Sequence, residues 1–255
     1  MLTIVSAAAA LQTFTPFAFY STLYAEMAMN YHIDNILIWD NFREKGECPL
    51  CGIYLTIEGK FVSSYLNEAV MEDSCRGEVN RYGFCPRHFE QLYMGDNKLG
   101  LALQAHTRLG YLMKEIEVAE SRRAAQKMAD KLMGHLKSCV ICSLIGPHME
   151  RYAGAVAQMY GKDGEFKKLF WEGKGFCMGH FCLLLNASRN AESCEKEYLR
   201  ALSQVQAKNL ERLHAELGHF ADMFDYKSNG KPWGTVKDAL ERCINKICGR
   251  IIEKP

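Results

Sequence analysis

Cysteine and histidine recur in this chain at the spacing of metal ligands. A Cys-x-x-Cys pair is followed, after 33 residues, by Cys-x-x-His, and the same order returns later in the chain with 34 residues between the pairs. The eight side chains are Cys48, Cys51, Cys85, His88, Cys139, Cys142, Cys177 and His180. Three thiolates and one imidazole are the ligand set of a closed tetrahedral zinc site. The sequence therefore predicts two Zn²⁺ ions per chain.

The residues around the two Cys-x-x-His pairs also repeat. Residues 83–89 read Gly-Phe-Cys-Pro-Arg-His-Phe, and residues 175–181 read Gly-Phe-Cys-Met-Gly-His-Phe. A cysteine and a histidine three positions apart share one face of a helix, and the glycine is expected to supply the turn that aims this helix. Each repeat is therefore predicted to close its own site, the first with Cys48, Cys51, Cys85 and His88 and the second with Cys139, Cys142, Cys177 and His180.

Two other arrangements of these ligands are open. Both Cys-x-x-Cys pairs could share a single four-thiolate site, although the nearly equal spacing to each Cys-x-x-His pair argues against this. Sites rich in thiolate also suit iron, so an iron–sulfur cluster is the alternative cofactor.

The elements that would position these ligands are predicted to be helices. Helical spacing of apolar residues marks an entry helix over 33–43, a helix after each Cys-x-x-Cys pair, and helices over 195–226 and 236–252. Residues 99–135 are rich in good helix formers and predict one long helix with a break at a glycine. No stretch alternates with a period of two, so the fold class is all-α, with two related helical copies, each organised around a Cys3His site.

The domain limits follow from the repeat. The first copy is assigned to residues 29–136 and the second, with a C-terminal helix, to residues 137–255. Residues 1–25 carry no charged side chain, so they lack the basic region of a secretory signal, and polar residues interrupt the apolar run that a membrane span needs. We predict that residues 1–28 are a disordered leader or an extension from an upstream start site.

Composition excludes several classes of partner. The formal net charge is +1, from 31 basic and 30 acidic residues, which gives no basis for a nucleic-acid or membrane surface. The cysteine count of 11 is odd and the spacing suits metal rather than disulfides, so a reducing, cytoplasmic compartment is predicted.

Other candidate groups fit a surface role better than chemistry. Glu211 with His214 and Glu216 with His219 form Glu-x-x-His pairs, but both pairs fall on one predicted helix, whereas di-iron bundles place them on two. Arg87 and His148 lie next to ligands and are predicted to be exposed to solvent. Because no nucleotide-binding or nucleophile motif occurs, no catalytic residue is predicted.

Several segments together resemble a bacterial protein family of unknown function. They are residues 31–34, Trp39, residues 46–51, the second Cys-x-x-Cys pair (Cys139 and Cys142) and the two Gly-Phe-Cys segments quoted above, and the resemblance covers about residues 29–252. It implies the same domain limits and ligand list, and it implies no activity.

These observations predict a metal-binding helical protein without catalytic activity, acting as a scaffold or interaction module. The long helices at 97–135 and 195–226 would present faces to a protein partner or to a second copy of the chain. A thiol-based redox or metal sensor and an iron–sulfur electron carrier are the alternatives.

Overall fold

A computed structural model describes residues 31–226 and 232–249, and every regular element in these ranges is helical. This confirms the all-α class. The elements are α2 (Tyr31–Arg43), α3 (Pro49–Leu66), η1 (Glu68–Val70), α4 (Asp73–Tyr82), α5 (Pro86–Met94), α6 (Lys98–Met113), α7 (Arg122–Leu136), α8 (Val140–Lys162), α9 (Gly164–Glu172), α10 (Met178–Asn186), η2 (Ser188–Cys194), α11 (Glu195–Asp222), η4 (Gly234–Val236) and α12 (Ala239–Cys248). None of these helices is long and apolar enough to cross a membrane. The predicted leader lies outside the described residues.

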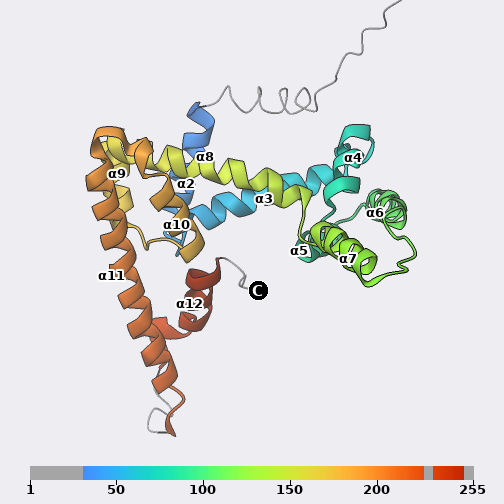
Figure 1. The fold of residues 1–255 in the computed structure, drawn as a ribbon. Helices are drawn as coiled ribbons and strands as arrows, with labels where there is room; N and C mark the ends of the chain where they lie inside the picture. The colour runs from blue at the N-terminus through green and yellow to red at the C-terminus, as the bar shows by residue number, and fades with distance from the viewer. Residues whose placement is uncertain (1–30, 227–231, 250–255) are drawn as a thin grey trace, which may run out of the picture.

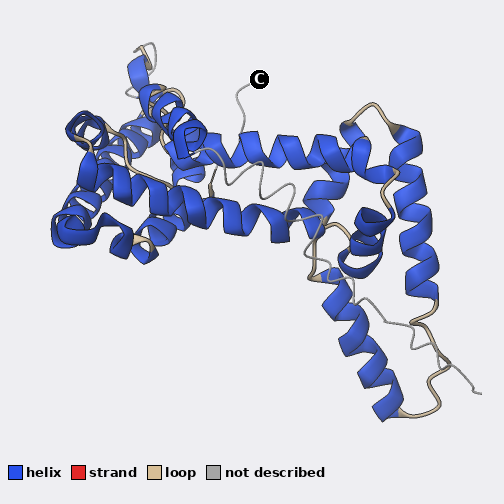
Figure 2. Cartoon of the chain, turned by 90° about the horizontal axis from the view of Figure 1, so that it is seen from above, coloured by secondary structure: helices blue, strands red, loops and turns tan. Residues whose placement is uncertain are grey.

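Helices α3 and α8 form the centre of the molecule. They lie side by side and run in opposite directions (Figures 1 and 2). Their facing sides bury apolar residues that belong to one continuous core, among them Leu50 and Ile53 on α3 and Ile145 and Val156 on α8. With 18 and 23 residues, the two helices are about 27 and 35 Å long. The pair therefore spans the molecule and separates its two ends.

Each end of the central pair carries its own group of helices (Figure 1). Helices α9, α10 and α11 gather where α3 begins and α8 ends, whereas α4, α5 and α6 gather where α3 ends and α8 begins. Because the pair is antiparallel, the chain leaving the end of one helix arrives next to the start of the other.

An aromatic cluster fixes the segment that precedes Cys177. The ring of Phe42 on α2 lies 4.9 Å from that of Phe166, and Phe170 lies 5.6 Å from Phe176, measured between ring centroids. All four phenylalanines are buried, so the residue next to Cys177 is held in the core. Such aromatic pairs stabilise beyond the area that they bury.

The predicted helix over 99–135 is broken into two helices, but the interruption over 114–121 contains no glycine, which corrects the expected place of the break. Helix α6 ends at Met113, and α7 begins at Arg122. The hydroxyl of Ser121 accepts a hydrogen bond from the backbone N–H of Ala124 at 3.2 Å, which caps the second helix. The prediction over 195–226 is confirmed by α11, whereas α12 is shorter than predicted and begins at Ala239.

Candidate metal centres

The eight predicted ligand side chains gather in two clusters of four. One contains Cys48, Cys51, Cys177 and His180, and the other contains Cys85, His88, Cys139 and Cys142. We call them the α3–α10 centre and the α5–α8 centre, after the helices that begin at their cysteines. Each has three thiols and one imidazole, so each could hold a metal ion.

The pairing corrects the prediction that each repeat closes its own site. Each Cys-x-x-Cys pair meets the Cys-x-x-His pair of the other repeat. The length of the helices explains this, because the part of α3 from Cys51 to Leu66 carries the chain about 22 Å away from Cys51. Helix α4, with only ten residues, is too short to bring Cys85 back, so Cys85 arrives beside the start of α8 instead. Helices α8 and α9 deliver Cys177 to the start of α3 in the same way.

The separations within each centre fit one tetrahedral ion. With zinc–sulfur bonds of about 2.3 Å and a zinc–nitrogen bond of about 2.0 Å, tetrahedral angles place two sulfurs about 3.8 Å apart and sulfur and nitrogen about 3.5 Å apart. In the α3–α10 centre, the Nδ1 atom of His180 lies 3.4 Å from the sulfur of Cys48, and the sulfurs of Cys51 and Cys177 are 3.7 Å apart.

The α5–α8 centre has the same dimensions. The Nδ1 atom of His88 lies 3.2 Å from the sulfur of Cys139 and 3.4 Å from that of Cys142. The sulfurs of Cys85 and Cys142 are 3.9 Å apart. Both centres therefore present the Nδ1 atom of histidine to the ion and leave Nε2 for another partner.

Four helix N-termini converge on the two centres, two on each. Cys48, Cys85, Cys139 and Cys177 are the N-cap residues of α3, α5, α8 and α10, and none of their side chains makes a capping hydrogen bond. The backbone repeats as well, with φ and ψ of −152° and 107° at Cys48 and −156° and 123° at Cys139. The positive end of a helix dipole favours thiolate over thiol. At Cys48, burial and the contacts with Cys177 and Cys51 outweigh this effect before a metal binds, and they raise the pKa of its thiol.

The glycine before each Phe-Cys adopts a conformation that other residues avoid. Gly83 has φ of 66° and Gly175 has φ of 78°. A Cβ atom on Gly175 would lie 2.9 Å from the Oε1 atom of Gln206. That amide accepts from the N–H of Phe176 and donates to its carbonyl, both at 2.9 Å. This confirms the predicted turn, and it adds Gln206 as the residue that holds the turn in place.

A buried carboxylate supports the imidazole of the α5–α8 centre. The Oε1 atom of Glu58 lies 3.1 Å from the Nε2 atom of His88, and both side chains are almost fully buried. The other oxygen of Glu58 accepts from Arg87 at 2.9 Å and from Gln91 at 3.0 Å. A carboxylate behind a histidine ligand fixes its orientation and raises its basicity. Arg87 is exposed to solvent, as predicted, and its guanidinium also holds this carboxylate.

A buried lysine links the segments of the α3–α10 centre. Lys246 on α12 is 1% exposed, and its ammonium donates to the backbone carbonyls of Glu47 and Lys174. Glu47 immediately precedes Cys48, and Lys174 precedes the Gly-Phe-Cys turn. At the α5–α8 centre, a backbone hydrogen bond links the corresponding two segments directly, since the N–H of Val140 donates to the carbonyl of Gly83 at 3.0 Å.

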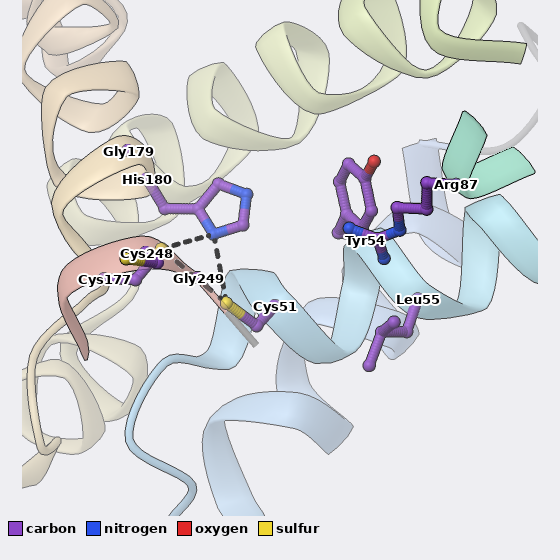
Figure 3. Close-up of a pocket in the computed structure, with 9 residues that line it drawn as sticks. All are labelled: Cys51, Tyr54, Leu55, Arg87, Cys177, Gly179, His180, Cys248 and Gly249. Carbon is purple, nitrogen blue, oxygen red and sulfur yellow. Dashed lines mark hydrogen bonds between the residues drawn. The ribbon is translucent and has the colours of Figure 1, made fainter. Parts of the chain in front are cut away.

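A cavity of about 250 Å³ opens beside the α3–α10 centre (Figure 3). Cys51, Cys177 and His180 line one side of it, and Tyr54 and Arg87 line the other. Figure 3 shows the second nitrogen of the His180 ring pointing toward Tyr54 across this space. No hydrogen-bonding partner of that nitrogen lies within residues 31–226 or 232–249.

Before a metal binds, protons are shared unevenly between imidazole and thiol in each centre. Burial alone would lower the pKa of His88, but its contacts with Cys139 and Glu58 outweigh this and raise it to about 10. Burial would raise the pKa of Cys139, but the contact with His88 lowers it to about 6. Burial alone would lower the pKa of His180, but its contact with Cys177 outweighs this and raises the pKa to about 9. Burial and the negative charge of Cys139 together raise the pKa of Cys142.

The remaining sequence candidates contribute no further centre among the described residues. Glu211, His214, Glu216 and His219 all lie on α11, as predicted. The carboxylate of Glu216 pairs with Arg212 at 3.1 Å, and Glu216 belongs to neither metal centre. His148 is 5% exposed, so the prediction of a surface histidine is wrong.

Comparison with known proteins identifies a protein family. A family of unknown function (DUF6062) matches residues 29–254. No curated protein and no solved structure matches the chain.

Proposed function

The chain belongs to this family of unknown function, and we propose that it is a metal-stabilised helical scaffold in which two structural zinc ions hold the ends of the α3–α8 pair together. The observation that carries the proposal is the crossed pairing of the ligands. Each ion would link segments that the sequence separates, the α3–α10 ion by 126 to 132 residues. Links across long stretches of chain restrict the unfolded state strongly.

The ligand sets favour a structural ion over a catalytic one. Catalytic zinc sites have three protein ligands and leave the fourth position to water or substrate, whereas structural sites have four protein ligands. Each centre offers four, all with ligand atoms within 4.8 Å of one another. We therefore assign no catalytic activity to either centre.

The same spacing favours a single ion over an iron–sulfur cluster. The cysteines of a cluster bind different iron atoms around a core of iron and sulfide, so they cannot all lie as close as the ligands of one ion. Sulfur separations of 3.7 and 3.9 Å match one tetrahedral ion. Thiolates with imidazole suit zinc among the common divalent ions.

The proposal is tested by the metal content of protein purified without oxygen or chelator. Elemental analysis should find two zinc ions per chain, and the visible spectrum should show no absorption. Cys51→Ser should remove one ion. Cys75→Ser, at a half-buried cysteine outside both centres, should remove none. Iron with visible absorption would replace this proposal by an electron-transfer function.

We propose that the interaction surface is the arm formed by α6 and α7. Helix α7 has no buried residue, and apolar side chains of α6 and the following loop are exposed, including Leu109 at 61%, Met113 at 71% and Val118 at 89%. Leu109 and Met113 are four positions apart on α6 and so share one face of that helix, and an exposed apolar face marks a site of protein contact. The partner is another protein or a second copy of this chain.

Sedimentation velocity over a range of concentrations tests whether a second copy of this chain is the partner. The double variant Leu109→Lys, Met113→Lys should remove any concentration-dependent association. The control Ile36→Lys changes a 57% exposed side chain on α2 and should leave association unchanged. A chain that is monomeric at all concentrations points to a different protein as the partner, which crosslinking of wild type and arm variant would then compare.

One observation favours a redox sensor as the second candidate. Cys142 is exposed although it belongs to the α5–α8 centre. A peroxide could therefore take two electrons from the thiolates of Cys139 and Cys142, forming a disulfide, releasing the ion and yielding water or hydroxide. Stoichiometric zinc release with that disulfide at low peroxide concentration would favour the sensor, and retention of zinc would favour the scaffold.

A further inference from the structure

The two centres have the same ligands but differ in what supports their histidines. In the α5–α8 centre, Glu58 contacts the Nε2 atom of His88 at 3.1 Å. The repeat places Met149 of α8 at the position that Glu58 has on α3, ten residues after the first cysteine of the pair. Met149 is buried and has no carboxylate, so His180 lacks the support that His88 has. Removing such support typically costs about 10- to 100-fold in metal affinity.

The surroundings of His180 also leave room for another ligand. The cavity beside the α3–α10 centre reaches Cys51, Cys177 and His180, and its wall includes Cys248 at the end of α12. Cys248 is exposed and belongs to neither cluster. Cys248 and Cys177 both line this cavity, and both are labelled in Figure 3.

The backbone after Cys248 comes close to a ligand sulfur. Gly249 has φ of 87°, and a Cβ atom built on it would lie 4.0 Å from the sulfur of Cys177. Lys246, two residues before Cys248, holds α12 against the segments that carry Cys48 and Cys177. The backbone at the end of α12 is therefore held beside the centre, and Cys248 lines the cavity while remaining outside the ligand set.

We propose that the α3–α10 centre is an exchangeable metal site, in which Cys248 replaces His180 as a ligand while the ion enters or leaves, and that the α5–α8 centre retains its ion. The inference rests on the proposed function, because it needs an ion in each centre. The inference adds regulation by the metal supply to the proposed function. When the α3–α10 centre loses its ion, α12 and the start of α3 are no longer held against α10, and they are held again when the ion returns.

The exchange step balances in atoms and charge. The zinc–nitrogen bond to His180 breaks, and the bond from zinc to the sulfur of Cys248 forms. The proton leaves the thiol of Cys248 and goes to the freed imidazole. A centre with three thiolates and charge −1 becomes one with four thiolates and charge −2, and the imidazolium carries the additional +1. No oxidant or reductant is needed, since zinc does not change its oxidation state.

The experiment is the release of zinc from the two-zinc protein to a chromogenic chelator, followed in time. We expect two phases of one ion each. Glu58→Gln should accelerate the slow phase by about 10- to 100-fold and leave the fast phase unchanged. Cys248→Ser should slow the fast phase severalfold. Cys243→Ser is the matched control, because Cys243 is half-buried on the same helix and does not line the cavity.

Hydrogen exchange assigns the phases without mutation. After removal of the first ion, backbone protection should fall in α10, α12 and the start of α3, and persist in α5 and the start of α8. Loss of protection at α5 first, as the exposed Cys142 would suggest, overturns the inference, and so does a fast phase that Cys248→Ser leaves unchanged.

Failure of this inference can be told apart from failure of the proposed function. Fewer than two zinc ions in the purified protein would contradict the structural framework itself. Two ions that leave in a single phase, or that leave in the opposite order, would preserve the framework and contradict only the exchangeable site.

Discussion

The sulfur of Cys51 lies 3.7 Å from the sulfur of Cys177, although the two residues are 126 positions apart in the sequence. The two cysteines come from different repeats, so the contact shows that the repeats exchange their Cys-x-x-His segments. A reciprocal contact joins Cys85 to Cys142 at 3.9 Å. Neither repeat can complete a four-ligand centre from its own residues in this arrangement.

The crossed pairing predicts which cysteines become reactive when one ligand is lost. Cys177→Ser should expose Cys48 and Cys51 to alkylation and leave Cys139 and Cys142 protected, because a thiolate bound to zinc reacts slowly. Peptide mass mapping after brief treatment with iodoacetamide measures this. Zinc content should fall by one ion per chain.

The reciprocal variant is the control for that experiment. Cys85→Ser should expose Cys139 and Cys142 and leave Cys48 and Cys51 protected. If Cys177→Ser instead exposed Cys139 and Cys142, the ligands would pair within each repeat and the crossed arrangement would be wrong.

The ligand types and the helical class could be predicted from sequence, but the pairing could not. The distance from Cys51 to Cys85 in the sequence nearly equals that from Cys142 to Cys177. This equality holds whether each repeat closes its own centre or both exchange segments. The deciding feature is the length of α3, because a rigid 18-residue helix carries the chain away from its own cysteines. Helix length and ligand spacing together favour the exchange.

The sequence carries little signal for the residues that support the ligands. Glu58 follows Ile57 on the apolar face of α3, and an acidic residue on a buried face is the one signal that the sequence offered for it. Lys246 gives no such signal, since a lysine on an amphipathic helix is usually exposed. Its role depends on α12 packing against segments about 70 and 200 residues earlier.

The strained turn at Gly175, before Cys177, should not tolerate a side chain, whereas Gly179, four residues later, should. Gly175→Ala should destabilise the folded protein by about 1–3 kcal/mol, because its positive φ is strained for alanine and a Cβ atom would lie 2.9 Å from Gln206. Gly179→Ala, in α10 with nothing within 4 Å of its Cβ position, should be neutral or stabilise by up to about 1 kcal/mol. Urea unfolding of the zinc-bound protein compares them. Equal effects would contradict the strained turn.

Metal binding should release protons, so the apparent affinity should rise with pH. Near pH 7.5, His88 is protonated before binding because its pKa is about 10, and Cys142 is a thiol because burial and the charge of Cys139 raise its pKa. Both must lose a proton to bind the ion, so at least about two protons leave and log affinity rises about two units per pH unit.

Calorimetric titration of the α5–α8 centre in buffers with different ionisation enthalpies counts these protons. Cys51→Ser isolates this centre by disabling the other one. The dependence on pH should weaken as the pH passes about 10, where His88 is already neutral. Binding without proton release would show that imidazole and thiol are deprotonated beforehand, which contradicts the ion pair between His88 and Cys139.

Lys246 should contribute to stability out of proportion to its place near the end of the chain. Lys246→Met keeps most of the buried side-chain volume but leaves the carbonyls of Glu47 and Lys174 without their donor. The carboxylate of Glu47, 3.2 Å from the ammonium, also loses a charged neighbour. We expect a loss of about 2–4 kcal/mol in the free energy of unfolding. Lys237→Met, at an exposed lysine just before α12, should change it by less than about 0.5 kcal/mol. Equal losses in denaturant titrations would show that α12 does not hold the α3–α10 segments together through this lysine.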